Sequence, residues 1–480
     1  MKKQFVINLI LLVVLNLLIK PFWVFGIERE VQNLVGAEQY GFYFSLFNFS
    51  ILMNMLLDMG ITNYNQRHIA RDHNRLKSAL SGFIGMKLML SLVYVVFGFA
   101  AGYLIGYDWN QLYLLAFLLI NQVFISFIQY WRSNISGLHL FFTDSLLSVL
   151  DKSLMIIICS ILLFIPSYRN QFEIEWFVYG QTIAYAVAWC VAALVVLYHS
   201  GKLKIQLNWK ESISTIRKTA PYALLVLLMA LYNRIDSVML ERMLPDGKAQ
   251  AGIYAQSFRI LDAGAMFGVL FAGLLLPMFS RMLKKNEAVT DLLRLASKLI
   301  IMPALAVWCV SHFYSHPISD LLYHNHVVET SKLLPVLMGS FVFICTSYIF
   351  GTLLTANGSL KALNQMAAAG LLLNIILNWI FIPKMQALGA AYTSFATQGA
   401  TAIMQLFIAI RIFRFSINWS LIVRLMVFTI LIFGISYVTT SLENWGYSLM
   451  VIIASGLLFS FLLQLLNMKE LLSFLSKTEK

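Results

Sequence analysis

The chain of 480 residues is 60% hydrophobic and only 12% charged, whereas soluble globular domains carry about 25% charged residues. No polar stretch is long enough to form a soluble domain, which excludes a large soluble enzyme. The net charge of +13 would suit a nucleic-acid partner, but its distribution along the chain, described below, has a different explanation.

A helix needs about 20 apolar residues to cross the roughly 30 Å of hydrocarbon in a bilayer. The sequence predicts fourteen such spans and therefore an all-α polytopic membrane protein. In chain order the predicted spans are 5–27, 40–61, 82–106, 112–131, 146–165, 176–199, 219–241, 250–280, 295–315, 333–356, 362–382, 387–410, 419–440 and 446–466. The first span follows two lysines and has no small-residue cleavage site, so we expect it to stay uncleaved.

Lysine and arginine gather in alternate loops of this arrangement. With the N-terminus in the cytoplasm, most of the 35 Lys and Arg residues fall on the inner side, in segments such as 67–77, 202–218 and 281–298. Basic residues accumulate in cytoplasmic loops because they resist translocation. The pattern predicts that both termini are cytoplasmic, and it explains the positive charge without a nucleic-acid partner.

Two short segments of the sequence resemble each other. Residues 36–43 and 247–254 both read G-x-x-Q-x-G-x-Y, and each opens a predicted span on the outer face. We interpret them as equivalent parts of two parallel six-helix halves, a transporter plan in which substrate binds between the halves. The predicted division is a six-helix bundle at 1–208, a second at 209–415, and two additional helices with a short cytoplasmic tail at 416–480. Chance similarity of two turn-like segments is the alternative.

Charged residues inside the predicted spans are the main functional signal, because a charge at the centre of a span costs about 2.5–3.5 kcal/mol on insertion scales. By helix rise, Lys20, Arg234 and Arg259 lie in the outer half of the membrane. Asp236 and Asp262 are close to them in sequence, and Arg259 and Asp262 share a helix face. One hypothesis is a central cavity whose cations bind an anion and whose acids bind a coupling ion. The alternative is a set of ion pairs that fix helix packing. Three cations against two acids favour the anion site.

Two charges near the inner ends of spans have simpler explanations. Asp58 precedes Gly60 at the end of the second span, where it would serve the helix end or pair with a cation, with ion coupling as the other candidate role. Lys87 lies near the inner end of the third span. We expect its long side chain to carry the ammonium to the lipid headgroups.

Other polar residues give weaker signals. His312 and His316 are spaced i,i+4, as in some zinc sites, but no acid accompanies them, so no metal is predicted. The role of these two and of His324 and His326 stays open. The asparagines Asn364, Asn374 and Asn378 either line a cavity or bond between helices. No phosphate-binding glycine loop is present, so neither ATP hydrolysis nor a cofactor is expected.

Several short motifs resemble those of one family. They are the segment 36–43, Asp58-Met-Gly60 followed by residues 67–71, and the segments 233–236, 251–259, 354–358, 374–378 and 382–391. In this order along fourteen spans, the chain resembles bacterial polysaccharide flippases of the Wzx type. These belong to the MATE-like multidrug/oligosaccharidyl-lipid/polysaccharide exporter superfamily.

The resemblance implies two bundles around a cavity that opens alternately to each face of the bacterial cytoplasmic membrane. Its cargo would be an oligosaccharide linked to polyprenyl diphosphate, flipped to the outer leaflet for a surface polysaccharide such as the O-antigen of lipopolysaccharide. The residues expected to hold this cargo are Arg234, Arg259 and Lys20, of which Lys20 aligns least closely. Asp236, Asp262 and Asp58 are the candidates for a coupling Na⁺ or H⁺ or for charge pairing. Other membrane proteins of polysaccharide assembly are the expected partners.

Two other functions are open at this point. A cation-coupled exporter of drugs or metabolites in the same superfamily would have a more acidic cavity and usually twelve spans. A membrane glycan polymerase would need catalytic groups on a large outer loop, and no predicted outer loop is large enough. We therefore expect a transporter without catalytic residues.

Overall fold

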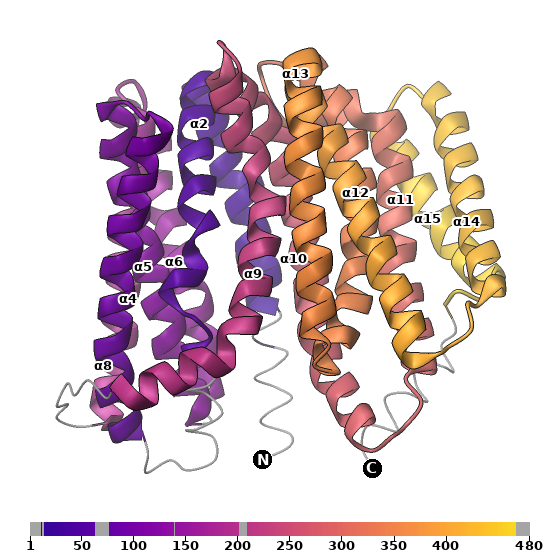
Figure 1. The fold of residues 1–480 in the computed structure, drawn as a ribbon. Coiled ribbons are helices and arrows are strands. Elements are labelled where there is room, and N and C mark those ends of the chain that lie inside the picture. Colours follow the sequence, from indigo (N-terminus) through magenta and orange to yellow (C-terminus); the bar gives the residue numbers. More distant parts are fainter. Residues whose placement is uncertain (1–10, 12–13, 63–75, 139, 201–208, 467–480) are drawn as a thin grey trace. The chain divides into compact units, whose positions relative to one another are not determined.

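The computed structural model describes residues 11, 14–62, 76–138, 140–200 and 209–466. These residues form helices joined by short connections, and no strand occurs among them (Figure 1). The elements are a helical stretch at 14–22, η1 (Trp23–Glu28), α2 (Arg29–Leu52), η2 (Asn54–Leu57), α4 (Leu76–Ile105), α5 (Trp109–Gly137), α6 (Phe141–Phe164), α7 (Pro166–Arg169), α8 (Ile174–Ser200), α9 (Trp209–Met243), α10 (Gly247–Lys284), α11 (Thr290–Leu322), α12 (Val327–Ala356), α13 (Leu360–Phe413), α14 (Trp419–Val438), η4 (Thr439–Ser441) and α15 (Trp445–Leu462).

Two of these elements are interrupted by a residue with a positive φ, so each holds two helices. Gly36 interrupts α2 with φ 77° and ψ 172°, a conformation that glycine adopts without steric penalty. Gln386 interrupts α13 with φ 53° and ψ −132°. There the next backbone N–H, of Ala387, donates to Gln250 Oε1 over 3.3 Å.

The number of spans confirms the prediction. Eleven described helices are long and apolar enough to cross a membrane, with the 54 residues of α13 counted as one helix. Dividing α13 at Gln386 adds one, and the two helices that meet at Gly36 add two, which gives fourteen within the described residues. The predicted ends differ from those of the structure at several helices. The first helix runs through η1 as far as residue 35 instead of ending near 27, and α9 begins at Trp209 instead of near 219.

The chain divides into two compact units. Unit 1 comprises Met1–Gln256 with Asn378–Ala387, and unit 2 comprises Ser257–Leu377 with Leu388–Lys480. These units follow packing in space, whereas the predicted boundaries at 208/209 and 415/416 follow a sequence repeat. The repeat-based division stays a prediction.

In unit 1 an apolar cluster joins the helices around α5. Phe127, Tyr130 and Trp131 of α5 pack with Met86 of α4 and Ala192 of α8. Small residues such as alanine let helix backbones approach closely, and close packing replaces the hydrophobic effect as the main attraction between helices in lipid. This apolar packing holds the helices of unit 1 together around the polar side chains between them.

In unit 2 the last two helices pack against α11. Cys309 of α11 shares a buried cluster with Ile432 of α14 and Ile452 of α15. The hydroxyl of Tyr314 donates to Thr439 Oγ1 over 2.8 Å, which adds a polar bond at the end of this contact. The opposite faces of α14 and α15 expose large apolar side chains, as expected for helices that face lipid.

The two similar segments pack against each other within unit 1. A Cβ at Gly41 would overlap the carbonyl oxygen of Lys248, and a Cβ at Gly252 would overlap that of Ala37. Each of these glycines is the second one in its G-x-x-Q-x-G-x-Y segment. The contact is reciprocal, so the two segments occupy equivalent positions around it.

Replacing either glycine by valine should separate the two backbones. We expect Gly41→Val and Gly252→Val each to destabilise the protein by about 1–3 kcal/mol, the usual cost of overpacking. The melting temperature of the purified protein in detergent measures this loss. Gly434→Val on α14 is the matched control, because nothing lies within 4 Å of a Cβ there. Equal melting temperatures for all three variants would contradict the contact.

Candidate functional site

Helix α9 holds Arg234 against the second span. Its half-buried guanidinium donates from Nη1 to Asn48 Oδ1 at 3.5 Å. Asn48 is itself 1% exposed and donates to Ser237 Oγ over 2.9 Å. All three residues belong to unit 1. Asn48 thus helps to orient the guanidinium of Arg234.

Asp236 lies two residues after Arg234 on α9 and is buried, with 1% exposure. The hydroxyl of Tyr254 donates to its Oδ2 over 3.1 Å, and Asn378 Nδ2 donates to its Oδ1 over 2.7 Å. These partners come from α10 and α13 and belong to unit 1 with Asp236. The sequence predicted that Asn378 either lines a cavity or bonds between helices, and in the structure it bonds between helices.

Arg259 and Asp262 lie in unit 2. Arg259 Nη1 is 3.4 Å from Asp262 Oδ2 on the same face of α10, as the i,i+3 spacing predicts. Arg259 is 8% exposed. The structure thus places Lys20, Asp58, Arg234 and Asp236 in one unit and this pair in the other.

Lys20 is half-buried and lies among charges of neighbouring helices, namely Asp151, Lys152 and Arg132. Lys152 was missed as a candidate. Its ammonium donates to the Tyr185 hydroxyl over 3.0 Å and lies 5.3 Å from the ring centroid of Trp23, a cation–π contact. The available signal is its position inside the predicted span 146–165.

Glu28 is a second residue that the sequence analysis missed. It ends the π-helical element η1, is 3% exposed, and accepts a hydrogen bond of 2.7 Å from the Tyr40 hydroxyl. Short π-helical segments often occur at functional sites. The predicted end at residue 27 had placed Glu28 in a loop, which concealed it.

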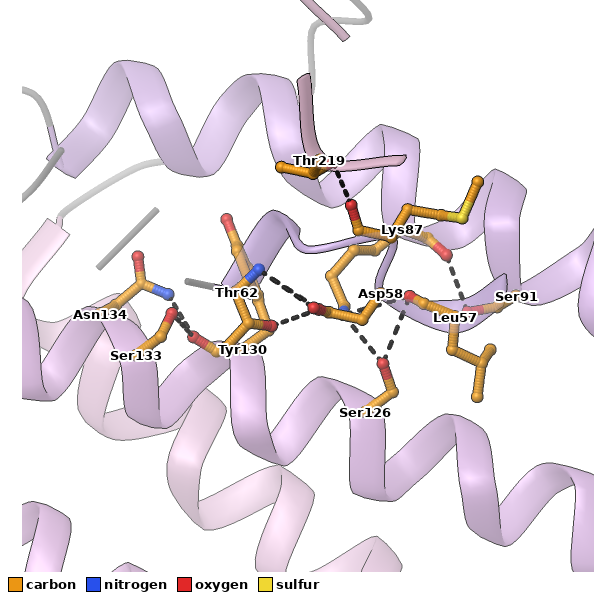
Figure 2. Close-up of polar contacts among 11 residues, drawn as sticks. Leu57, Asp58, Thr62, Lys87, Ser91, Ser126, Tyr130, Ser133, Asn134 and Thr219 are labelled. Atoms are coloured by element: carbon orange, nitrogen blue, oxygen red, sulfur yellow. Dashed lines mark hydrogen bonds and ion pairs between the residues drawn. The ribbon is translucent and has the colours of Figure 1, made fainter. Parts of the chain in front are cut away.

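Asp58 forms an ion pair with Lys87, whose Nζ lies 3.0 Å from Asp58 Oδ1 (Figure 2). Asp58 also accepts a bond of 3.3 Å from the backbone N–H of Thr62, so it serves a helix end as well. The prediction that Lys87 reaches the headgroups is wrong, because its side chain is 0% exposed. A partner on a neighbouring helix holds the ammonium inside the protein.

His312 of α11 lies among aromatic rings. The ring of His312 is 5.3 Å from that of Phe313 and 5.4 Å from that of Phe433, centroid to centroid. In the part of the chain that the structure describes, no group of three or more His, Cys, Asp or Glu side chains is placed to hold a metal ion.

Residues 6–283 match the family of polysaccharide biosynthesis proteins. The capsular polysaccharide biosynthesis protein CapF of Staphylococcus aureus is 24% identical over 266 residues, or 53% of this chain and 65% of that protein. The chain therefore spans slightly less than two thirds of this curated relative.

Solved structures show a similar fold. The lipid II flippase MurJ in an inward closed conformation aligns with a TM-score of 0.69 and 16% identity, over 95% of this chain and 98% of that chain. A multidrug resistance MATE family transporter of the MOP superfamily, in an inward-facing conformation, aligns with a TM-score of 0.62 and 16% identity, over 84% and 94%. The chain is thus a multi-pass membrane protein with a MATE-like fold, and it belongs to the polysaccharide biosynthesis protein family.

Proposed function

We propose that this protein flips a lipid-linked oligosaccharide or polysaccharide precursor from the inner to the outer leaflet of the bacterial cytoplasmic membrane by alternating access. The observation that supports this most directly is Arg234, whose guanidinium lies inside a membrane span and donates to the side chain of Asn48. The family of the chain, whose model matches residues 6–283, supports a saccharide as cargo.

The cations inside the spans would offset the main energetic cost of this transport, which is moving the charged diphosphate through hydrocarbon. A polyprenyl diphosphate head group carries negative charge that hydrocarbon does not solvate, so its crossing needs fixed positive charges at membrane depth. Arg234, Arg259 and Lys20 are the proposed contacts, and Lys152 beside Lys20 joins them. Guanidinium groups suit phosphate because they donate two parallel hydrogen bonds. The lipid tail remains in the bilayer while the head group crosses.

Asp236 is our proposed site for a coupling Na⁺ or H⁺, with Asp262 as the second candidate. The buried carboxylate of Asp236 contacts the oxygen of Tyr254 and the amide of Asn378. Hard cations prefer oxygen ligands such as the Asp236 carboxylate, and a buried carboxylate between helices is a common proton carrier in transporters. Because its partners lie on α10 and α13, binding there would change the contacts of three helices together.

The proposed setting is cell-surface polysaccharide assembly, with both termini of the chain in the cytoplasm. Membrane proteins that build the lipid-linked saccharide on the inner face and consume it on the outer face are the expected partners. O-antigen and capsule precursors belong to the same chemical class. A drug exporter of the same fold is the alternative function, and it would leave surface glycan unchanged when lost.

Removal of the charge at Arg234 tests the cargo site. We expect Arg234→Gln to lower surface glycan at least tenfold in cells that depend on this gene, because one phosphate contact is lost at membrane depth. Arg424→Gln is the control, since Arg424 on α14 bonds instead to the Leu463 carbonyl. Immunoblotting of membranes checks that each variant is present. Normal glycan with both Arg234→Gln and Arg259→Gln, at unchanged protein levels, would contradict the cargo site.

Asp236→Asn tests the coupling ion. A bound ion stabilises the folded protein by about 2.7 kcal/mol at one hundred times its dissociation constant. The wild-type protein in detergent should therefore melt at a higher temperature with NaCl than with choline chloride if Na⁺ couples. If H⁺ couples, its melting temperature should instead depend on pH.

Asp236→Asn should lose that response, while Asp262→Asn retains it. A wild-type protein whose melting temperature is insensitive to both Na⁺ and pH would refute ion coupling. If the response persists in Asp236→Asn, the ion binds elsewhere and Asp236 is not the coupling site.

A further inference from the structure

The second span is interrupted near its inner end. After α2, Met53 leaves helical geometry, η2 covers Asn54–Leu57, and Met59 and Gly60 have φ values of 46° and 83°. An interruption of this kind releases backbone carbonyls from the helix, and at membrane depth each needs a partner within the protein. The carbonyls of Leu57 and Met59 both have one.

Lys87 provides the partner for Leu57. Its Nζ donates to the Leu57 carbonyl over 3.3 Å, to Asp58 Oδ1 over 3.0 Å and to Ser126 Oγ over 2.8 Å (Figure 2). The rings of Phe127 and Tyr130 lie 5.8 Å and 5.6 Å from the same nitrogen. An ammonium has three N–H donors, so these three oxygens use all of them, and the side chain is 0% exposed.

This set of oxygens resembles the ligands of a bound metal cation. One carboxylate, one carbonyl from an interrupted helix and one hydroxyl are the groups that transporters present to Na⁺ at discontinuous helices. Here the positive charge in their midst belongs to the chain itself. A second cation would have to displace Lys87 to enter.

We infer that Lys87 is a tethered cation that permanently fills a cation site at the break of the second span. Asp58 is then the fixed counter-charge of this site and takes no part in ion coupling. The site needs a positive charge in it, because without Lys87 the Asp58 carboxylate and the Leu57 carbonyl lose their shared donor. Removing one member of a buried pair is far more damaging than removing both.

The filled site also positions the inner end of α9. The hydroxyl of Thr219 donates to the Met59 carbonyl, and a Cβ at Gly60 would lie 2.8 Å from the Thr219 Cβ. Thr219 begins the apolar part of α9, Thr219–Met243. Lys87 orients the break, the break binds Thr219, and Thr219 anchors the helix that carries Arg234. Lys87 is therefore a positioning residue.

Chemical rescue tests the tethered cation and needs no knowledge of the cargo. The purified full chain with Lys87→Ala should melt several degrees below the wild-type protein, because the Asp58 charge loses its partner. Propylammonium has the size of the deleted part of the side chain, and it can enter because the Asp58 side chain is 23% exposed. Added propylammonium should restore most of the loss, while propanol of the same size and the larger cation choline should not.

Wild-type melting should not respond to propylammonium. If Lys87→Ala does not fold when made alone, it is produced and purified with propylammonium throughout. The double variant Asp58→Asn with Lys87→Met should be more stable than Lys87→Met alone and insensitive to the amine. Rescue by propanol equal to that by propylammonium, a lack of rescue, or a Lys87→Ala protein as stable as the wild type would each overturn the inference.

A double-mutant cycle tests the link to α9. Thr219→Val removes the hydroxyl, and Thr219→Ser retains it and should behave as wild type. If Lys87 positions the carbonyl that Thr219 binds, the double variant Thr219→Val with Lys87→Met should lose markedly less melting temperature than the sum of the losses of the two single variants. Thr429→Val is the control, because the Thr429 hydroxyl donates within α14, to the Leu425 carbonyl over 2.8 Å, and its effect should add to that of Lys87→Met. Full additivity for Thr219→Val would overturn the link.

Discussion

Hydrocarbon provides no hydrogen-bonding partner, so each charge within a membrane span has to be satisfied by the protein. In this chain that constraint decides where helices break and which helices meet. Lys87 is 0% exposed only because the interrupted second span turns a carbonyl and the carboxylate of Asp58 towards it. Asp236 is buried because Tyr254 and Asn378 bring donors from two other helices. These polar contacts therefore determine which helices meet and at which positions, while apolar contacts pack the rest of the bundle.

Much of the fold could be predicted because its signals are local. A run of apolar residues identifies a span by itself, and the distribution of Lys and Arg fixes how many spans lie between the termini. The turn at Gly36 carries its own signal, because glycine is suited to a φ of 77°. The break at Gln386 carries none, since a glutamine rarely adopts a φ of 53°. The extension of the first helix beyond residue 27 places Glu30 within 3.0 Å of Arg169, which is 139 residues away in the chain, and no local pattern in the sequence indicates that contact.

The sequence predicted the roles of site residues whose partners are near in the chain, but not of those whose partners lie on other helices. Arg259 and Asp262 pair because they are three residues apart on one helix. Lys87 was misplaced because its partner Asp58 lies on another helix. Lys152 escaped notice for the same reason, since its embedding depends on Tyr185 and Trp23 from two different helices. Sequence alone identifies a charge in a span, but the partner that decides its role is found only in the folded structure.

Movement of a defined cargo between leaflets tests the central proposal most directly. The purified protein is reconstituted into liposomes with a fluorescent oligosaccharide on polyprenyl diphosphate, and a membrane-impermeant enzyme that cleaves the saccharide reports the accessible fraction. With the flippase present, we predict that cleavage rises from the outer-leaflet half towards completion, and that Arg234→Gln slows this rise. Cleavage that stops at the outer-leaflet half in wild-type proteoliposomes, as in protein-free ones, would contradict the account.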